Sequence, residues 1–224
     1  MNYDLSPLLL TFKLALVTTL ILLLVGVPFA WWMASTRCRG KALVEALVSM
    51  PLVLPPSVLG FYLLLAFSPQ GWFGGLIESL SGLRLAFSFE GLVLASVIFS
   101  FPFMVHPVQS ALQSLPASLS EAACTLGKSR WQVFLHVLLP NIRPALLGGA
   151  VLSFTHTIGE FGVVLMIGGS LPGETRVASI AIYDEVESLN YAAAHFYALV
   201  LFVVCFFTLL AVYLLTRRGI RAAA

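Results

Sequence analysis

The stretch SLPASLSEAACTLGKSRWQVFLHVLLP, residues Ser114 to Pro140, is a polar and basic interlude between hydrophobic segments that are each long enough to cross a bilayer. Apolar residues recur at helical spacing in its first half, and Ser118 with Glu121 has the S-x-x-E form of a capping box. Gly127 follows, and glycine enters the left-handed C-terminal cap without a Cβ penalty. A first short helix that ends at Gly127 is therefore expected.

The second half of the stretch is expected to form another short helix in a new direction. Ser129 and Gln132 give a second capping-box pattern, and Pro140 is expected to stop this helix. Residues 122–129 also satisfy a relaxed phosphate-loop pattern, but a phosphate loop needs a preceding strand and a glycine-rich bend. A DNA-binding helix-turn-helix is another alternative, but the stretch has no soluble domain around it that would present such a motif to DNA. Two capped helices between membrane spans form a rigid knob that is suited to transmitting a push.

The composition identifies an integral membrane protein. Of the 224 residues 59% are hydrophobic and 10% are charged, whereas soluble domains have roughly 25% charged residues. The net charge of +2 is too small to argue for nucleic acid. Cys38, Cys124 and Cys205 are scattered, and His106 and His136 lack convergent carboxylates or cysteines, so neither a disulfide framework nor a metal or catalytic site is expected.

Five charge-poor segments are predicted to cross the membrane, since one span needs about 20 apolar residues. Within the second segment, PLVLPP at residues 51–56 places three prolines in six residues, so this span is predicted to be kinked or broken. A short amphipathic piece is expected at residues 77–83, and a polar loop at 168–190. The predicted spans are residues 14–36, a second span that begins the charge-free stretch 46–77 and is ended by residues 69–75, and residues 91–113, 144–167 and 192–216. The expected fold is all-α, with a loop between the third and fourth spans.

The Lys and Arg residues select the orientation in the membrane. Nine of them lie in the loop after the first span, in the central stretch through Arg143 and in the tail, whereas the opposite face has only Lys13, Arg84 and Arg176. Basic residues accumulate on the cytoplasmic side. The N-terminus is therefore predicted outside, and the central stretch and the C-terminus inside.

The central stretch resembles the EAA loop of ABC importer permeases. Glu121-Ala122-Ala123 is followed after three residues by Gly127, and later by Val137 and Leu139-Pro140, where the family pattern has I-x-LP. The stretch departs from the pattern only in Val137 for Ile. The resemblance implies a type I permease fold whose cytoplasmic loop docks into a groove on an ATPase subunit.

The resemblance also implies partners and roles. It implies one transmembrane permease domain over residues 1–224 with a coupling loop at 114–140, dimerised around a central pathway, and no C-terminal regulatory domain is expected after the fifth span. Two ATPase subunits would carry ATP and Mg²⁺, so this chain is expected to bind no cofactor and to be no enzyme. A substrate-binding protein is expected outside the bacterial-type inner membrane. The residues assigned to ATPase coupling are Glu121, Ala122, Ala123, Gly127, Arg130, Trp131, Leu139 and Pro140.

Three more motifs are similar to the molybdate branch of the family. They are PLVLPP at 51–56, GEFG at 159–162 and PGETR at 172–176; sulfate and thiosulfate permeases share the first two less closely. The resemblance implies import of molybdate or tungstate, with sulfate or thiosulfate as the alternative. An intramembrane enzyme that uses His156 and Glu160, and a secondary transporter or channel, are competing classes, and both leave the capped loop unexplained.

Helix breaks and hydroxyl side chains are candidates for the transport path, because freed backbone groups at membrane depth must face protein or water. Close helix packing is the alternative role of the hydroxyls. An ionised carboxylate near mid-membrane costs about 2.5 to 3.5 kcal/mol, so Glu160 needs a partner, and His156 one turn earlier would share its helical face. A structural pair, backbone hydrogen bonds around GEFG and a proton relay all remain open. The path candidates are Pro55, Pro56, Ser57, Ser100, Ser153 and Glu160.

The loop at residues 168–190 is the candidate docking surface for the binding protein. Arg176 either guides the anion or forms a salt bridge with the acids of this loop. No Arg or Lys is expected at mid-depth to hold a dianion, so substrate specificity is predicted to reside chiefly in the binding protein. The docking residues are Pro172, Gly173, Glu174 and Arg176.

Overall fold

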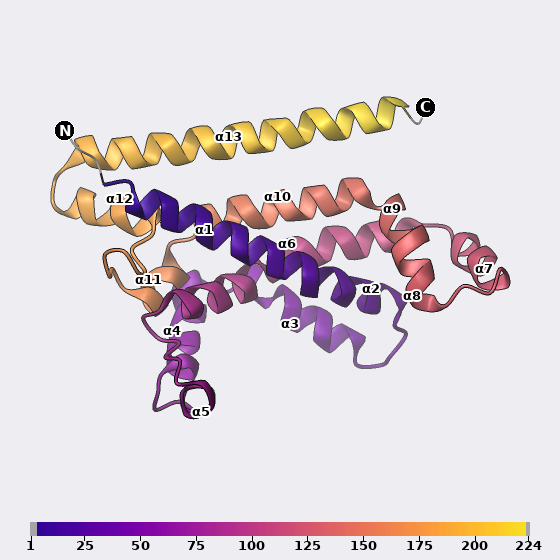
Figure 1. Cartoon of the computed structure of the whole chain (residues 1–224), viewed down its shortest axis with the longest axis horizontal. Helices are drawn as coiled ribbons and strands as arrows, with labels where there is room; N and C mark the ends of the chain where they lie inside the picture. Colours follow the sequence, from indigo (N-terminus) through magenta and orange to yellow (C-terminus); the bar gives the residue numbers. More distant parts are fainter. Residues whose placement is uncertain (1–3, 223–224) are drawn as a thin grey trace.

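The computed structural model describes residues 4–222, with side chains through residue 214, and every regular element in that range is helical. The basic tail residues Arg217, Arg218 and Arg221 therefore lie outside the described side chains. Long helices run side by side along the molecule (Figure 1). In chain order the elements are α1 (Ser6–Ile21), η1 (Leu22–Gly26), α2 (Val27–Ser35), α3 (Lys41–Val53), α4 (Pro56–Phe67), α5 (Trp72–Ser81), α6 (Phe89–Ser114), α7 (Ala117–Thr125), α8 (Arg130–Val133), η2 (Phe134–Leu138), α9 (Leu139–Asn141), α10 (Arg143–Gly159), α11 (Gly162–Gly168), α12 (Ala178–Glu187) and α13 (Tyr191–Ala222).

Three helices of the described chain are long and apolar enough to cross a membrane by themselves. They are Ser6–Ser35, Phe89–Ser114 and Tyr191–Leu214, and two bent helix pairs raise the number of candidate spans to as many as five. The first of the three contains a π-helical turn, η1, where the chain passes from α1 into α2. The all-helical membrane fold expected from the sequence is confirmed.

Helix α6 is the centre of the packing. It contributes Leu92 and Phe99 to one buried cluster and Met104 and Val108 to another. Helices α1, α2, α10 and α11 pack against it. By contrast α3 has no buried residue, so it presents a face that this single chain does not cover.

The predicted break in the second span is present. The chain bends by 114° between α3 and α4. Leu54 and Pro55, which lie between these helices, are extended, with ψ of 138° and 134°. Proline lacks the N–H that a continuous helix needs, and it forces the preceding residue out of the helical region. The sequence alone therefore determines this break.

The fourth span was expected to be one continuous helix over residues 144–167, and this prediction is wrong. Helix α10 ends at Gly159, Glu160 is extended with ψ of 129°, and α11 begins at Gly162. The reason is tertiary, because α11 packs tightly on α4. A Cβ added at Gly162 would lie 2.8 Å from the Cβ of Pro56. The two helix breaks are thus in direct contact.

Two further expectations for the connecting segments change. The amphipathic piece predicted at 77–83 is α5, which starts earlier at Trp72. The segment 168–190, predicted to be a polar loop, contains α12, whose Ala178, Ile180 and Ala181 are buried. Polar and acidic residues between the apolar ones made this segment look like a loop. The helix is stabilised by packing against α1 and α13.

Candidate functional site

The central stretch folds as two short helices joined at Gly127, as predicted, and lies at one end of the molecule with the end of α2 (Figure 1). Gly127 has φ +75°, the left-handed conformation that favours glycine. The predicted capping box of Ser118 and Glu121 is wrong. Because Pro116 is extended, α7 begins already at Ala117 and has no side-chain cap, so Ser118 lies inside the first turn.

The second capping box is present. The Ser129 hydroxyl accepts from the Gln132 N–H at 3.3 Å, and the Gln132 side chain accepts from the Ser129 N–H at 3.0 Å. The prediction that Pro140 stops the helix is wrong, because the helical backbone continues through η2 and α9 to Asn141. Proline is tolerated at the first turn of a helix, which is where Pro140 lies in α9. The chain then bends by 79° into α10.

Aromatic stacking ties the second half of this loop to the first span. The rings of Trp31 and Phe134 are stacked with centroids 4.5 Å apart, and Trp131 lies 5.6 Å from Trp31. Such aromatic pairs contribute about 0.5–1.5 kcal/mol beyond the area that they bury. The loop is therefore anchored to the end of α2, and its position is fixed relative to the long helices.

The residues assigned to coupling divide into an exposed group and an anchored group. Glu121, Ala122, Gly127, Arg130 and Trp131 are exposed. In contrast Ala123 is buried, while Leu139 and Pro140 are half-buried, and Leu139 packs against the core cluster of α6. The exposed group forms a surface that another protein can reach.

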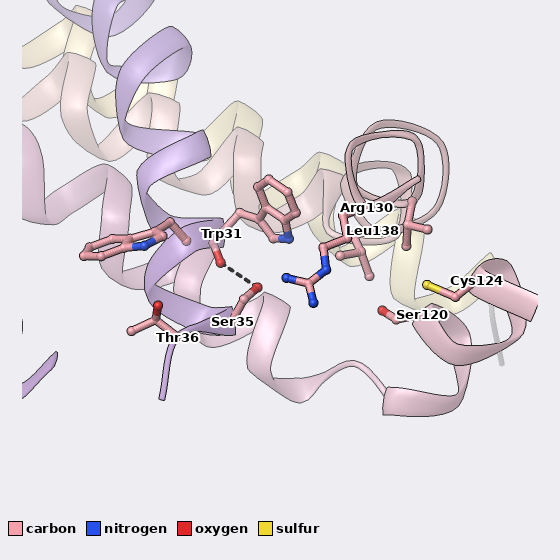
Figure 2. Close-up of a pocket in the computed structure, with 9 residues that line it drawn as sticks. Trp31, Ser35, Thr36, Ser120, Cys124, Arg130 and Leu138 are labelled. Atoms are coloured by element: carbon pink, nitrogen blue, oxygen red, sulfur yellow. Dashed lines mark hydrogen bonds between the residues drawn. The ribbon is translucent and has the colours of Figure 1, made fainter. Parts of the chain in front are cut away.

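A cavity of about 560 Å³ lies between the end of α2 and the coupling loop. Figure 2 shows the Arg130 guanidinium projecting into it between Ser35 on one side and Ser120 with Cys124 on the other. The Ser35 hydroxyl donates to the Trp31 carbonyl at 2.9 Å. This hollow adds to the exposed surface of the loop a recess of mixed lining, with aromatic and aliphatic walls and one basic group, Arg130.

Polar contacts that were not predicted from the sequence join α3 to α6. The Gln109 amide donates to Glu45 at 2.8 Å, and the Ser49 hydroxyl lies 3.1 Å from Nε2 of His106. Lys41 approaches Glu45 at 3.8 Å. The spacing of Lys41, Glu45 and Ser49, four residues apart on one helical face, was the available signal. These contacts fasten α3 to the helix that leads directly into the coupling loop.

The path candidates occupy two different environments. Pro55, Pro56 and Ser57 are exposed at the break between α3 and α4. Ser100 and Ser153 are fully buried, with Ser100 3.0 Å from the Thr157 hydroxyl, so these two residues pack α6 against α10 in this conformation. The break, and not the buried hydroxyls, faces the uncovered side of the chain.

Of the roles left open for Glu160, the pair with His156 does not form. Nδ1 of His156 lies 3.0 Å from the Ser100 hydroxyl, and the imidazole packs against Phe99 and Phe103. Because α10 ends at Gly159, Glu160 leaves the helical face that the i to i+4 spacing assumed. Its backbone N–H bonds to the Thr157 carbonyl, while both carboxylate oxygens are buried without a hydrogen-bond partner in the described chain.

The candidate docking loop is a compact turn. The Leu171 carbonyl accepts from the N–H groups of Glu174, Thr175 and Arg176, and the buried Thr175 hydroxyl donates to the Gly168 carbonyl at 2.6 Å. Residues 172–174 are exposed at its tip. Arg176 pairs with Asp184 at 2.9 Å and Glu185 at 3.5 Å. The salt-bridge alternative for Arg176 is therefore the contact observed.

Comparison with known proteins assigns the family. A model of the family described as binding-protein-dependent transport system inner membrane component matches residues 26–221. The chain belongs to this family. The chain is 47% identical over 212 residues to a molybdenum transport system permease protein of Azotobacter vinelandii, covering 95% of this chain and 94% of that protein. It is also 38% identical to a probable sulfate transport system permease protein of Chlorella vulgaris, with 92% and 77% covered.

Solved structures share the fold. One inward-facing structure of a methionine ABC transporter superposes with a TM-score of 0.72 at 18% identity, covering 95% of this chain and 94% of that one. The prediction of an ABC importer permease, a multi-pass protein of the inner membrane, is confirmed. The enzyme and secondary-transporter alternatives are set aside, since family members are transporter components and not enzymes themselves.

Proposed function

We propose that this permease imports a tetrahedral oxyanion, with molybdate or tungstate preferred and sulfate or thiosulfate as the alternative. The observation that carries the proposal is the 47% identity, over nearly the whole of both chains, to a molybdenum transport permease. The lower identity of 38% to a sulfate permease places sulfate second. The chain would act as the membrane-spanning subunit of an ATP-driven importer.

The coupling loop docks an ATPase subunit in this proposal. Its exposed residues Glu121, Ala122, Arg130 and Trp131 form the contact surface, and the turn at Gly127 sets the angle between the two helices. ATP and Mg²⁺ belong to the ATPase, and this chain holds no cofactor. The ring contacts of Trp31 support this role, because a loop that transmits force must be fixed to the spans that it moves: Phe134 is stacked on Trp31, and Trp131 lies tilted against it.

Motion of the loop reaches the path through two helices. The loop is continuous with α6, α6 is fastened to α3 by the Glu45–Gln109 and Ser49–His106 contacts, and α3 ends at the Pro55 break. A displacement of the loop therefore acts on the break through hydrogen-bonded helices. The exposed Pro55, Pro56 and Ser57 would line the transport path there.

Two copies of the chain form the pathway in this proposal, each bound to one ATPase subunit. The uncovered face of α3 supports a second copy, which would cover the exposed apolar side chains of Leu43, Leu47 and Met50 that this chain leaves open. The clustering of Arg37, Arg39 and Lys41 near the coupling loop supports a cytoplasmic position of that end. The N-terminus would then lie outside and the C-terminus in the cytoplasm.

Substrate choice resides chiefly in an external binding protein that docks on the tip of the outer turn, with Pro172, Gly173, Glu174 and Arg176. The ion pairs of Arg176 with Asp184 and Glu185 support a docking role in preference to anion capture, because they already neutralise its charge. No Lys or Arg lies in α4, α11 or the breaks beside them. A weakly attractive path suits a pump, since a tight site would slow release.

Uptake by the reconstituted permease, ATPase and binding protein tests the proposal. We expect ATP-dependent uptake of molybdate and tungstate, with weaker competition by sulfate. When the binding protein is exchanged for one of another oxyanion specificity that still docks, substrate choice should follow the binding protein. If the substrate preference stays the same after the exchange, the membrane subunit itself selects the substrate. If sulfate is taken up and molybdate is not, sulfate replaces molybdate as the proposed substrate.

A further inference from the structure

Glu160 is a buried carboxyl whose charge nothing in the described chain compensates. Its side chain is 4% exposed, and neither carboxylate oxygen has a hydrogen-bond partner there. The backbone of the residue is well held, since its carbonyl accepts from the Ser179 hydroxyl at 2.6 Å. Phe161 next to it packs against Tyr183, with ring centroids 5.2 Å apart. The carboxyl is therefore fixed inside the packed break between α10 and α11.

The charged groups on the surrounding helices are engaged elsewhere or lie at the helix ends. None of the ion pairs formed by the described residues includes Glu160. Helices α4 and α11 have no Asp, Glu, Lys, Arg or His. The charged and imidazole groups on the other helices that pack here are Lys13 of α1, over the Phe89 ring; Glu90 and His106 of α6; Arg143 and His156 of α10; Asp184, Glu185 and Glu187 of α12, with Arg176 before it; and His195 of α13. The other titratable side chains on these helices are those of Tyr183 in α12, whose hydroxyl donates to Glu187, and of Tyr191, Tyr197, Cys205 and Tyr213 in α13, and α4 has Tyr62.

One polar group near the Glu160 carboxyl is the Ser96 hydroxyl of α6. Ser96 is fully buried, and its hydroxyl also has no hydrogen-bond partner in the described chain. A calcium ion takes about 6–8 oxygen ligands, and magnesium needs a near-octahedral set. The described residues contain no group of three His, Cys, Asp or Glu that could hold a metal ion. A lone carboxyl outside any such group is poorly suited to hold a metal ion, and it is sufficient to bind a proton.

We propose that Glu160 is a proton-binding site at the α10–α11 break, occupied while the break is packed as in this structure. The neutral acid avoids the cost of several kcal/mol that an unpaired buried charge carries, and its O–H can donate to the Ser96 hydroxyl. Loss of the proton breaks the O–H bond and transfers the proton to water. Water reaches the carboxylate when α11 separates from α6 and α12. Because Gly162 of α11 rests on Pro56, this opening also moves the break at the path.

Infrared difference spectroscopy tests the site without reference to transport. The full chain is measured in lipid nanodiscs at neutral pH, and Glu160→Gln is compared with Glu90→Gln, which removes an exposed carboxyl at the start of α6. We expect the carbonyl band of a protonated carboxylic acid to disappear in Glu160→Gln and to persist in Glu90→Gln. An identical band in wild type and Glu160→Gln would overturn the proposal. A band whose intensity changes with sodium or potassium at constant pH would also overturn it, since a metal cation would then compete for the carboxyl.

The link between the proton and the break rests on the proposed transport function and is measured separately. In the reconstituted importer, wild-type uptake should change with alkaline pH as Glu160 ionises, whereas Glu160→Gln, a neutral amide of the same shape, should lack that alkaline component. Glu90→Gln should keep the wild-type profile. If uptake depends on pH in the same way in wild type and Glu160→Gln while the infrared band is confirmed, the proton site stands. Its link to opening of the α10–α11 break is then overturned. Absence of any oxyanion uptake, with the band confirmed, would contradict the proposed function alone.

Discussion

The coupling loop and the paired helix breaks are both sharp changes of chain direction, and they are stabilised in different ways. The turn at Gly127 is exposed and local: its conformation comes from one glycine and from the adjacent Ser129–Gln132 box. The break at Glu160 is buried and non-local, since it depends on Gly162 packing against Pro56 of another span. An exposed turn can transmit a push to a partner, whereas a buried break can move only together with its neighbour.

The difference predicts where a single added methyl group has its largest effect. In Gly162→Ala the new Cβ would meet Pro56 at 2.8 Å, and overpacking of this kind costs about 1–3 kcal/mol. We expect a lower thermal midpoint of the purified chain and a severe loss of uptake. Gly159→Ala is the matched control at the same break, because a Cβ there meets nothing within 4 Å. Equal midpoints for the two variants would show that the contact between the breaks is not what positions α11.

At the coupling loop the effect should be conformational and not steric. A Cβ at Gly127 also meets nothing within 4 Å, yet φ is +75°, a region that costs most residues roughly 1–2 kcal/mol. Gly127→Val should therefore reduce ATP-driven uptake by about tenfold or more, while the spans stay inserted. Gly127→Asn should retain most activity, because Asn tolerates the left-handed region.

Uptake and ATPase binding are measured together for this pair. If Gly127→Val retains full ATPase binding and normal uptake, the turn does not set the coupling geometry. If Asn fails as completely as Val, the requirement is for the absence of a side chain, which would indicate that a partner lies against this position.

The same contrast explains what the sequence could predict. Proline at 55 and 56, glycine at 127 and the Ser129–Gln132 pair act on the backbone within a few residues, so the first break and the coupling loop follow from local rules. The end of α10 has no proline, and its break is caused by packing between residues far apart in the chain. Such contacts leave no local pattern, which is why the prediction of a continuous span was wrong and why a His156–Glu160 pair was among the roles left open.

The errors in the coupling loop also have a local cause. The S-x-x-E pattern at Ser118 was genuine in sequence, but the extended Pro116 allowed the helix to begin two residues earlier than a cap at Ser118 requires. Pro140 was expected to end a helix, although a proline in a first turn is compatible with helical structure. The first error concerns where a helix begins and the second where one ends, and neither changes the order of the helices.

The connection between the two regions can be weakened at Gln109. In Gln109→Leu the Glu45 carboxylate loses a hydrogen bond of 2.8 Å, and a hydrogen bond to a charged group contributes about 1.5–3 kcal/mol. We expect ATP hydrolysis to continue with fewer anions moved per ATP, because α3 no longer follows α6. Gln113→Leu, an exposed position one turn later, is the control. A proportional fall of hydrolysis and uptake in Gln109→Leu would indicate general damage instead of uncoupling.

The second capping box should have a smaller effect than Gly127. Ser129→Ala removes the acceptor for the Gln132 N–H, and loss of such a cap costs about 1 kcal/mol. We expect a modest decrease in the affinity for the ATPase, and Ser129→Thr should largely restore it. If Ser129→Ala binds the ATPase with unchanged affinity, the stacking on Trp31 alone is sufficient to hold the second helix.

The outer turn should show the smallest effect. Arg176 pairs with Asp184 and Glu185, and these side chains are 23%, 30% and 20% exposed; partly exposed ion pairs of this kind contribute about 0.2–1 kcal/mol, and salt screens them. Arg176→Gln should therefore weaken binding-protein docking slightly, with the difference from wild type shrinking as ionic strength rises. Relative uptake of molybdate and sulfate should stay the same, because the guanidinium is occupied by carboxylates and is not available to select an anion. Arg84→Gln, which breaks the exposed pair with Glu78, serves as the control for loss of one outer positive charge. A changed substrate preference in Arg176→Gln but not in Arg84→Gln would mean that Arg176 leaves its carboxylates and guides the anion, and the membrane subunit would then contribute to selectivity.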